Sequence, residues 1–142
     1  MDEITYQLNH GKVNFDDSKM IRQAVFVEEQ GFENEFDDID NSAYHLVLYL
    51  DSHPVATARM YQKDEETMIL GRIAVLKQYR KHGLGAKAVQ RLEKEAQKLG
   101  FKKIELSAQQ QAMNFYQKLG YESFGDIYYD EWCPHIKMVK KI

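Results

Sequence analysis

A basic, glycine-containing stretch in the middle of the chain has the residue types of a phosphate-binding loop. Arg80-Lys81-His82 precedes Gly83-Leu84-Gly85, and an amphipathic segment follows as far as Gly100. The glycines would let a ligand approach the backbone closely. A helix that begins here would also offer unpaired N–H groups at the positive end of its dipole. Backbone donors and basic side chains together favour a phosphate ligand.

Other interpretations of this stretch are open on sequence grounds. Residues 83–88 fit the G-x-G-x-x-A pattern of dinucleotide-binding proteins, and Glu105 lies at about the distance of the acid that binds the ribose. However, that motif directly follows a strand in a βαβ series, whereas residues 76–82 intervene here and a strand meander precedes them. A Walker A loop is excluded because no Gly-Lys-Ser/Thr follows. The remaining alternative is a helix that simply begins with glycines.

An acidic segment lies further towards the N-terminus. Between Val27 and Asp40 there is no cation, and the carboxylates are Glu28, Glu29, Glu33, Glu35, Asp37, Asp38 and Asp40. Such a segment is most often solvated, but it could also attract a cationic substrate through its long-range field. Because Phe32 and Phe36 interrupt it, we expect part of it to pack against the rest of the protein.

Composition limits the classes of function. The 142 residues, 44% of them hydrophobic, suit one domain over residues 1–142. A net charge of −3 does not indicate binding to nucleic acid or to an anionic membrane. The single cysteine, Cys133, excludes an internal disulfide and a cysteine-rich metal site, and the histidines lack metal-ligand spacing. We expect a cytoplasmic protein, since the N-terminus has no signal-peptide pattern.

Hydrophobic periodicity predicts the elements that must position the loop. Strands are expected at residues 3–9, 44–50, 54–61, 68–75, 103–108, 121–129 and 136–141, and helices at 19–30, 84–99 and 110–119. Asp16, Asp17 and Ser18 are expected to cap the first helix. The strand at 103–108 follows a crossover helix, so it should pair in parallel with the strand at 68–75. The order predicts an α/β fold with a mixed sheet, and neither a Rossmann fold nor a helix bundle.

Two motifs resemble those of the GNAT superfamily of acyl-CoA N-acyltransferases. Residues 80–85 resemble its R/Q-x-x-G-x-G/A pyrophosphate loop, and residues 115–121 resemble its F-Y-x-K-x-G-F element. The order of elements agrees over essentially the whole chain. Further segments, at residues 22–30, 71–75, 108–109 and 134–138, resemble the bacterial ElaA-like subgroup. The resemblance implies a mixed, mostly antiparallel twisted sheet with helices on both faces and a parallel pair splayed around an acyl-CoA site.

The resemblance also implies acetyl-CoA as the acyl donor, with no metal. Loop amides would hold the pyrophosphate, and the backbone of residues 73–75 would bind the pantetheine amides, which suits backbone donors and acceptors. Gln109 stands where many members have an asparagine that touches the CoA arm, and it can still donate and accept. The donor-binding residues implied are Ile73, Ala74, Val75, Arg80, Lys81, His82, Gly83, Leu84, Gly85, Ala86, Gln109, Phe115 and Tyr116.

Amide formation from a thioester needs a neutral amine, a polarised carbonyl and a proton for the leaving thiolate. Tyr116 matches the family tyrosine that protonates the sulfur, although its place on an apolar helical stripe also suits a core residue. A backbone N–H near Val75 could stabilise the oxyanion. Two residues are candidates for the base: Glu105, on a strand where some relatives carry a catalytic glutamate, and Glu28, on the apolar side of the first helix.

Arg22 and His135 are the candidates on the substrate side. Arg22 precedes Glu28 by about one and a half helical turns, so it could orient Glu28 or bind a substrate carboxylate. His135 lies in the expected turn of the last hairpin. Nothing in the sequence indicates that Cys133 is an activated nucleophile.

We therefore expect an N-acetyltransferase, a monomer or homodimer, that acts by direct transfer in a ternary complex on a small-molecule or peptide amine. One alternative is an acyl-homoserine-lactone synthase, because Arg22-x-x-Val25-Phe26 resembles the start of that related fold. A non-catalytic acyl-CoA-binding module and a dinucleotide-binding module are the others.

Overall fold

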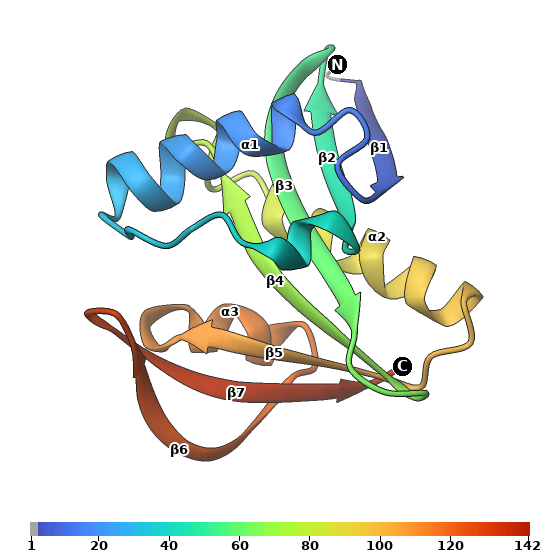
Figure 1. The fold of residues 1–142 in the computed structure, drawn as a ribbon, viewed down its shortest axis with the longest axis vertical. Helices are drawn as coiled ribbons and strands as arrows, with labels where there is room; N and C mark the ends of the chain where they lie inside the picture. The colour runs from blue at the N-terminus through green and yellow to red at the C-terminus, as the bar shows by residue number, and fades with distance from the viewer. Residues whose placement is uncertain (1–2) are drawn as a thin grey trace.

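The computed structural model describes residues 3–142, in which the strands form one seven-stranded sheet (Figure 1). The sheet order is β1-β2-β3-β4-β5-β7-β6. The strands are β1 (Ile4–His10), β2 (Tyr44–Leu50), β3 (His53–Gln62), β4 (Thr67–Val75), β5 (Lys103–Gln109), β6 (Glu122–Asp130) and β7 (Cys133–Lys141). β4 and β5 are parallel, and the other paired neighbours are antiparallel. The predicted mixed α/β fold is confirmed.

Helices cover both faces of the sheet. They are α1 (Asp16–Arg22), the π-helix η1 (Gln23–Glu29), α2 (Leu84–Lys98), α3 (Met113–Lys118) and the 3₁₀ turns η2 (Asp38–Asn41), η3 (Lys77–Tyr79) and η4 (Gln110–Ala112). Successive side chains of a strand point to opposite faces. On β2, Val47 packs in the cluster that contains α1, whereas Leu46 packs in the cluster that contains α2. α1 and α2 therefore lie on opposite faces, as Figure 1 shows.

The sheet opens between its two parallel strands. β4 pairs with β5 only from Thr67 to Leu70, and beyond that point the strands diverge (Figure 1). The register between β3 and β4 shifts here, so that Arg72 and Ile73 of β4 stand opposite the single residue Ala58. Arg72 has a φ of +52°, which is unusual for a residue with a side chain. Because a bulge of this kind bends its strand, the second half of β4 turns away from β5.

The structure corrects several predicted boundaries. The first helix begins at Asp16 with Phe15 at its N-cap, so the two aspartates lie in its first turn and do not cap it. Their charges still favour the positive end of the helix dipole. The remainder of that predicted helix is π-helical. β7 begins at Cys133, so His135 lies within a strand and not in the hairpin turn.

The apolar stripe of α2 is confirmed over most of its length. Leu84, Ala88, Leu92 and Ala96 are buried, whereas Leu99, at the C-cap, is 44% exposed and leaves the stripe. Among residues 3–142, no helix combines the length and the apolar character needed to cross a bilayer.

Candidate functional site

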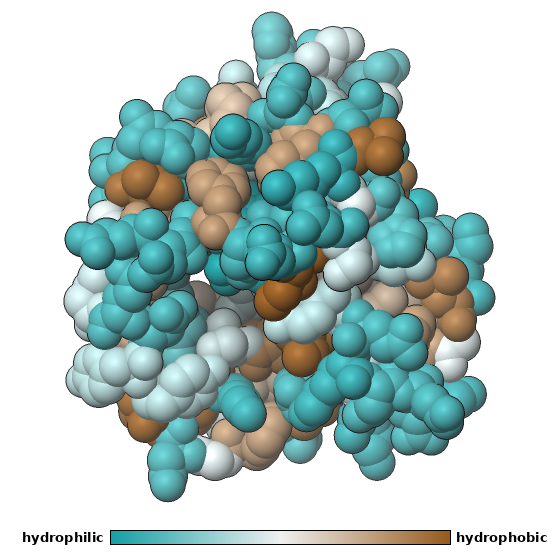
Figure 2. Space-filling view, in the orientation of Figure 1, coloured by the Kyte–Doolittle hydropathy of each residue, from teal (hydrophilic) through white to brown (hydrophobic). Residues whose placement is uncertain are grey.

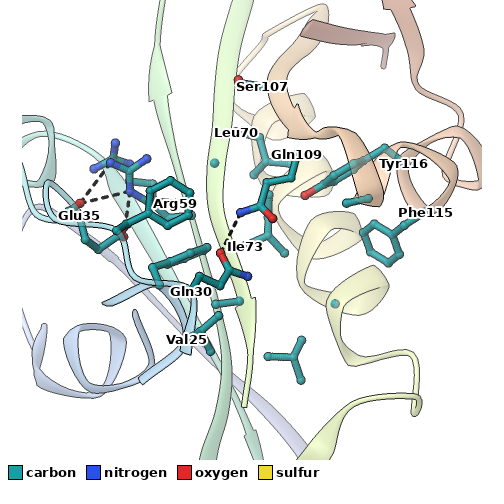
Figure 3. A pocket seen from close by; sticks show the side chains of 18 of the residues that line it. Val25, Gln30, Glu35, Arg59, Leu70, Ile73, Ser107, Gln109, Phe115 and Tyr116 are labelled. Atoms are coloured by element: carbon teal, nitrogen blue, oxygen red, sulfur yellow. Dashed lines mark hydrogen bonds and ion pairs between the residues drawn. The ribbon is translucent and has the colours of Figure 1, made fainter. Parts of the chain in front are cut away.

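A cavity of about 620 Å³ opens where β4 and β5 diverge. The glycine loop borders one part of it, and the acidic segment and the β6–β7 turn border another. Hydrophilic residues cover most of the face in Figure 2, with a few hydrophobic residues visible near its centre. Figure 3 shows the cavity walls, with side chains of the acidic segment on one side and Phe115 and Tyr116 on the other.

The glycine loop leads directly into α2 at the edge of this cavity. Gly83 is the N-cap residue of α2 with a φ of +74°, and no side chain caps the helix. The first N–H groups of α2 therefore have no side-chain partner. A methyl group at Gly85 would lie 3.4 Å from the Phe115 ring and 3.6 Å from Val75, which are ordinary van der Waals contacts, so α2 packs against both α3 and β4 here.

Tyr116 lines the cavity on α3 and is 8% exposed. Burial raises the pKa of its phenol above the ordinary value, and among residues 3–142 no hydrogen bond or charge adds to this shift. The hydroxyl therefore keeps its proton at neutral pH. Figure 3 shows the hydroxyl turned into the cavity, towards Gln109.

A chain of amide side chains crosses the cavity. Gln111 Nε2 donates to Gln109 Oε1 at 2.5 Å, and Gln109 Nε2 donates to Gln30 Oε1 at 2.9 Å. The second bond joins the end of η1 to the end of β5 beside Ile73 (Figure 3). Gln109 is therefore placed at the cavity, where it is held by protein partners on both of its amide atoms.

Ion pairs organise the part of the cavity furthest from the glycine loop. Glu35 accepts from Arg72 Nε at 2.9 Å and from Arg22 Nε at 2.8 Å. Asp40 binds Arg22 Nη1 at 2.8 Å and Arg59 Nη1 at 2.7 Å, and Asp37 also binds Arg59. Three carboxylates thus meet three guanidiniums. The charges of this cluster balance locally, which removes part of the attraction expected for a cation.

Burial and charge shift the pKa values of this cluster in different directions. Burial raises the pKa of Glu35 above its ordinary value, although both of its arginines act against the change. For Asp40, burial acts in the same upward direction, but hydrogen bonds from Arg22 and Arg59 hold the pKa below its ordinary value. Burial lowers the pKa of His45, whose Nε2 lies 3.0 Å from the Asp40 carbonyl and 3.9 Å from the Asp40 carboxylate.

His135 is buried and lines the cavity from β7. Its Nδ1 lies 3.0 Å from the carbonyl oxygen of Cys133, which can only accept, so Nδ1 carries the hydrogen. In the neutral ring Nε2 is then the unprotonated nitrogen, and the part of the chain that the structure describes provides no hydrogen bond to it. The imidazole can therefore accept a proton at Nε2. The Tyr128 ring stacks near it, with centroids 6.1 Å apart.

Comparison with known proteins decides the family. Residues 14–121 match the family described as Acetyltransferase (GNAT) family. This chain belongs to the GNAT family. YjcF of Bacillus subtilis, named as an uncharacterized N-acetyltransferase, is 38% identical over 127 residues, which are 87% of this chain and 90% of YjcF. ElaA of Escherichia coli is 29% identical over 128 residues, covering 86% of this chain and 84% of ElaA.

Solved structures agree with this assignment. The crystal structure of E. coli ElaA has a TM-score of 0.85 at 27% identity and covers 97% of this chain and 99% of ElaA. A GNAT family acetyltransferase from Elizabethkingia anophelis, solved with acetyl-CoA bound, has a TM-score of 0.72 over 98% of both chains. At 14% identity, this likeness shows the fold alone. The GNAT assignment and the mixed sheet also remove the dinucleotide-binding module as an alternative.

Most of the residues expected to bind the donor line the cavity of this GNAT protein. They are Ile73, Ala74, Val75, Arg80, Lys81, Gly83, Leu84, Gly85, Gln109, Phe115 and Tyr116. His82 and Ala86 do not line it; His82 borders a smaller pocket beside Tyr79.

Three other residues proposed from the sequence, two as the base and one on the substrate side, do not line the cavity. Glu28 is exposed outside the cavity, because the residues around it are π-helical and the helical spacing that placed it on the apolar side does not apply. Glu105 stands opposite Ile69, where β4 and β5 are still paired, and binds Lys63 at 3.1 Å. Arg22 is 0% exposed and binds Glu35 and Asp40, so these two carboxylates, and not Glu28, hold its guanidinium.

Sequence reasoning missed Gln30, Glu35 and Arg72 as cavity residues. Gln30 and Arg72 belong to segments that resemble the ElaA-like subgroup, but nothing in their spacing indicates a site. Arg72 pairs with Glu35 and Asp37 of the acidic segment. Within residues 3–142, no group of three metal-ligating side chains is gathered.

Proposed function

We propose that this GNAT protein transfers an acetyl group from acetyl-CoA to a primary amine by direct attack within a ternary complex. The observation that carries the proposal is one continuous cavity whose lining runs from the glycine loop along β4 to the Tyr116 hydroxyl. The glycine loop borders one part of the cavity and the ion-pair cluster lies in the other, so two different substrates could bind side by side. Family membership and the acetyl-CoA bound to the Elizabethkingia relative support the donor.

The part of the cavity that the glycine loop borders, which we call the donor half, suits acetyl-CoA as a substrate. The uncapped N-terminus of α2, with Arg80 and Lys81, would receive the pyrophosphate. Backbone groups of Ile73 to Val75 that face the opening have no partner on β5, since pairing stops at Leu70. The Val75 carbonyl accepts from Arg80 Nε at 2.9 Å, and the strand groups here that have no partner are suited to the amides of the pantetheine arm. Apolar side chains, Phe115 among them, line the space between these two regions.

The part of the cavity that the acidic segment and the β6–β7 turn border, which we call the acceptor half, would bind the amine and supply the group that takes its proton. In our proposal, Nε2 of His135 takes a proton from the substrate ammonium, and the neutral amine then attacks the thioester carbonyl carbon. A carbon–nitrogen bond forms and the carbon–sulfur bond breaks. The thiolate takes the phenolic proton of Tyr116, as general acid catalysis requires at this point, and the second proton lost by the nitrogen returns to the Tyr116 phenolate. A backbone N–H near Val75 would stabilise the oxyanion.

Binding and turnover test this function separately. Isothermal titration with acetyl-CoA and with NAD tests the donor, and we expect heat of binding for acetyl-CoA only. A panel of primary amines, followed by release of free CoA thiol, tests the acceptor. Binding of NAD without binding of acetyl-CoA would refute the proposal. Acetyl-CoA binding without turnover of any amine would favour the alternative of a non-catalytic acyl-CoA-binding module.

A further inference from the structure

The guanidinium of Arg80 is already occupied by a carboxylate from another element. Nη1 and Nη2 of Arg80 donate to the two carboxylate oxygens of Glu29 at 2.7 Å each. Its Nε donates to the carbonyl oxygen of Val75 at 2.9 Å, which holds the side chain against the end of β4. A guanidinium offers phosphate the same paired donors that it offers a carboxylate. Glu29 therefore uses the paired donors that Arg80 could otherwise offer to a phosphate.

The residue next to Glu29 reaches the other border of the cavity. Gln30 accepts a hydrogen bond from Gln109, at the end of β5. Consecutive side chains at the end of η1 thus contact the loop after β4 on one side and β5 on the other. Figure 3 shows the Gln30–Gln109 pair passing beside Ile73, on the strand proposed to bind pantetheine. A change at Glu29 is therefore positioned to affect the cavity itself.

We propose that Glu29 competes with the pyrophosphate of the acyl donor for Arg80, so that donor binding releases the end of η1 from the glycine loop. The inference rests on the proposed function, because it takes the pyrophosphate to lie at that loop. The Arg80 and Glu29 side chains are 35% and 33% exposed, so a ligand can reach the pair. The hydrogen bond from Arg80 lowers the pKa of Glu29, which keeps this carboxylate negative at neutral pH. A fixed negative charge here also repels a pyrophosphate.

Glu29→Gln removes the charge and keeps the shape of the side chain. The matched control is Glu33→Gln, which removes the same charge from an exposed residue of the same segment whose carboxylate has no ion pair among the described residues. Titration calorimetry would measure the Kd of CoA, of inorganic pyrophosphate and of S-acetylpantetheine, which lacks the pyrophosphate. Thermal melts would show that each variant is folded.

We expect Glu29→Gln to bind CoA and pyrophosphate more tightly by roughly 3- to 10-fold, the size expected for loss of one partly exposed ion pair and one repulsion. S-acetylpantetheine should bind unchanged, and Glu33→Gln should show a much smaller gain. The gain should also shrink when Glu29→Gln is made together with Arg80→Gln and compared with Arg80→Gln alone, because only the removed repulsion then remains.

The failures of the two proposals can be told apart. If the unaltered protein binds CoA and Glu29→Gln binds it equally or more weakly, the competition is refuted and the proposed donor stands. An equal gain in Glu33→Gln would show a general charge effect and would also refute it. If neither the unaltered protein nor Glu29→Gln binds CoA, both the donor assignment and the competition are wrong.

Discussion

Replacement of Arg22 by methionine tests whether the buried ion-pair cluster holds the wall of the cavity. Arg22 is 0% exposed and binds Glu35 and Asp40, and its guanidinium also lies 4.9 Å from the centre of the Phe36 ring. Methionine fills much of the same volume but leaves two buried carboxylates with one partner fewer each. Removal of one partner from a buried pair costs about 3–5 kcal/mol. Because Arg72 still binds Glu35 and Arg59 still binds Asp40, we expect about 3 kcal/mol.

Chemical denaturation monitored by circular dichroism measures this loss of unfolding free energy. In thermal melts it corresponds to a fall of roughly 10 °C for a chain of this size. Arg91→Met is the matched control, because Arg91 pairs with Glu95 on the surface of α2 and its side chain is 30% exposed. An exposed pair of this spacing contributes about 0.3–0.5 kcal/mol. Amide hydrogen exchange of residues 35–40 should also become faster in Arg22→Met but not in Arg91→Met.

Equal losses in Arg22→Met and Arg91→Met would refute the reasoning, since they would show that the buried cluster contributes no more than a surface pair. Unchanged exchange at residues 35–40, together with a large loss of stability, would show that other contacts hold the acidic segment in place.

Three further predictions concern the donor site, the catalytic proton and pH. Gly83→Ala and Gly100→Ala each introduce a side chain at positive φ, +74° and +93°, and should each lower the unfolding free energy by about 1–2 kcal/mol. Calorimetry should show weaker acetyl-CoA binding for Gly83→Ala only. Equal Kd values for the two variants would contradict the assignment of the glycine loop to the donor site. Tyr116→Phe should lower kcat roughly 10²- to 10⁴-fold with the Kd of acetyl-CoA unchanged, and unaltered turnover would exclude Tyr116 as the proton donor. Since burial lowers the pKa of His45 from its ordinary 6.5, the folded chain binds fewer protons than the unfolded chain between the two pKa values. Unfolding free energy should therefore decrease as pH falls from 6.5 through the folded pKa, and His45→Gln should remove that part of the slope; identical pH profiles would contradict it.

Local patterns in the sequence were sufficient for much of the fold and for the glycine loop that borders the cavity. Three of these patterns involve only a few neighbouring positions, so they are visible in the sequence before the fold is known. They are the apolar spacing of α2, the alternation of the strands and the residues of the glycine loop. The predicted parallel pairing of β4 and β5 is confirmed because a crossover helix leaves little choice of direction. The position of Tyr116 at the cavity agrees with the expectation drawn from the family resemblance.

The part of the cavity furthest from the glycine loop depended on the tertiary structure. Glu35 and Asp40 follow Arg22 by 13 and 18 residues, and Gln30 meets Gln109 across 79 residues, so no local pattern indicates these partners. The π-helical turn decided the exposure of Glu28, because it changes the angular spacing on which the prediction relied.

The sequence by itself thus determined the order of the elements, the glycine loop and the helix that carries Tyr116, because short-range periodicity and backbone geometry govern each of them. Only the tertiary structure decided that four of the seven carboxylates of the acidic segment pair with arginines, among them Glu29 with Arg80, and that β4 bends away from β5. Each of these depends on which distant residues the folded sheet brings together, and burial then sets the strength and the pKa values of the resulting contacts.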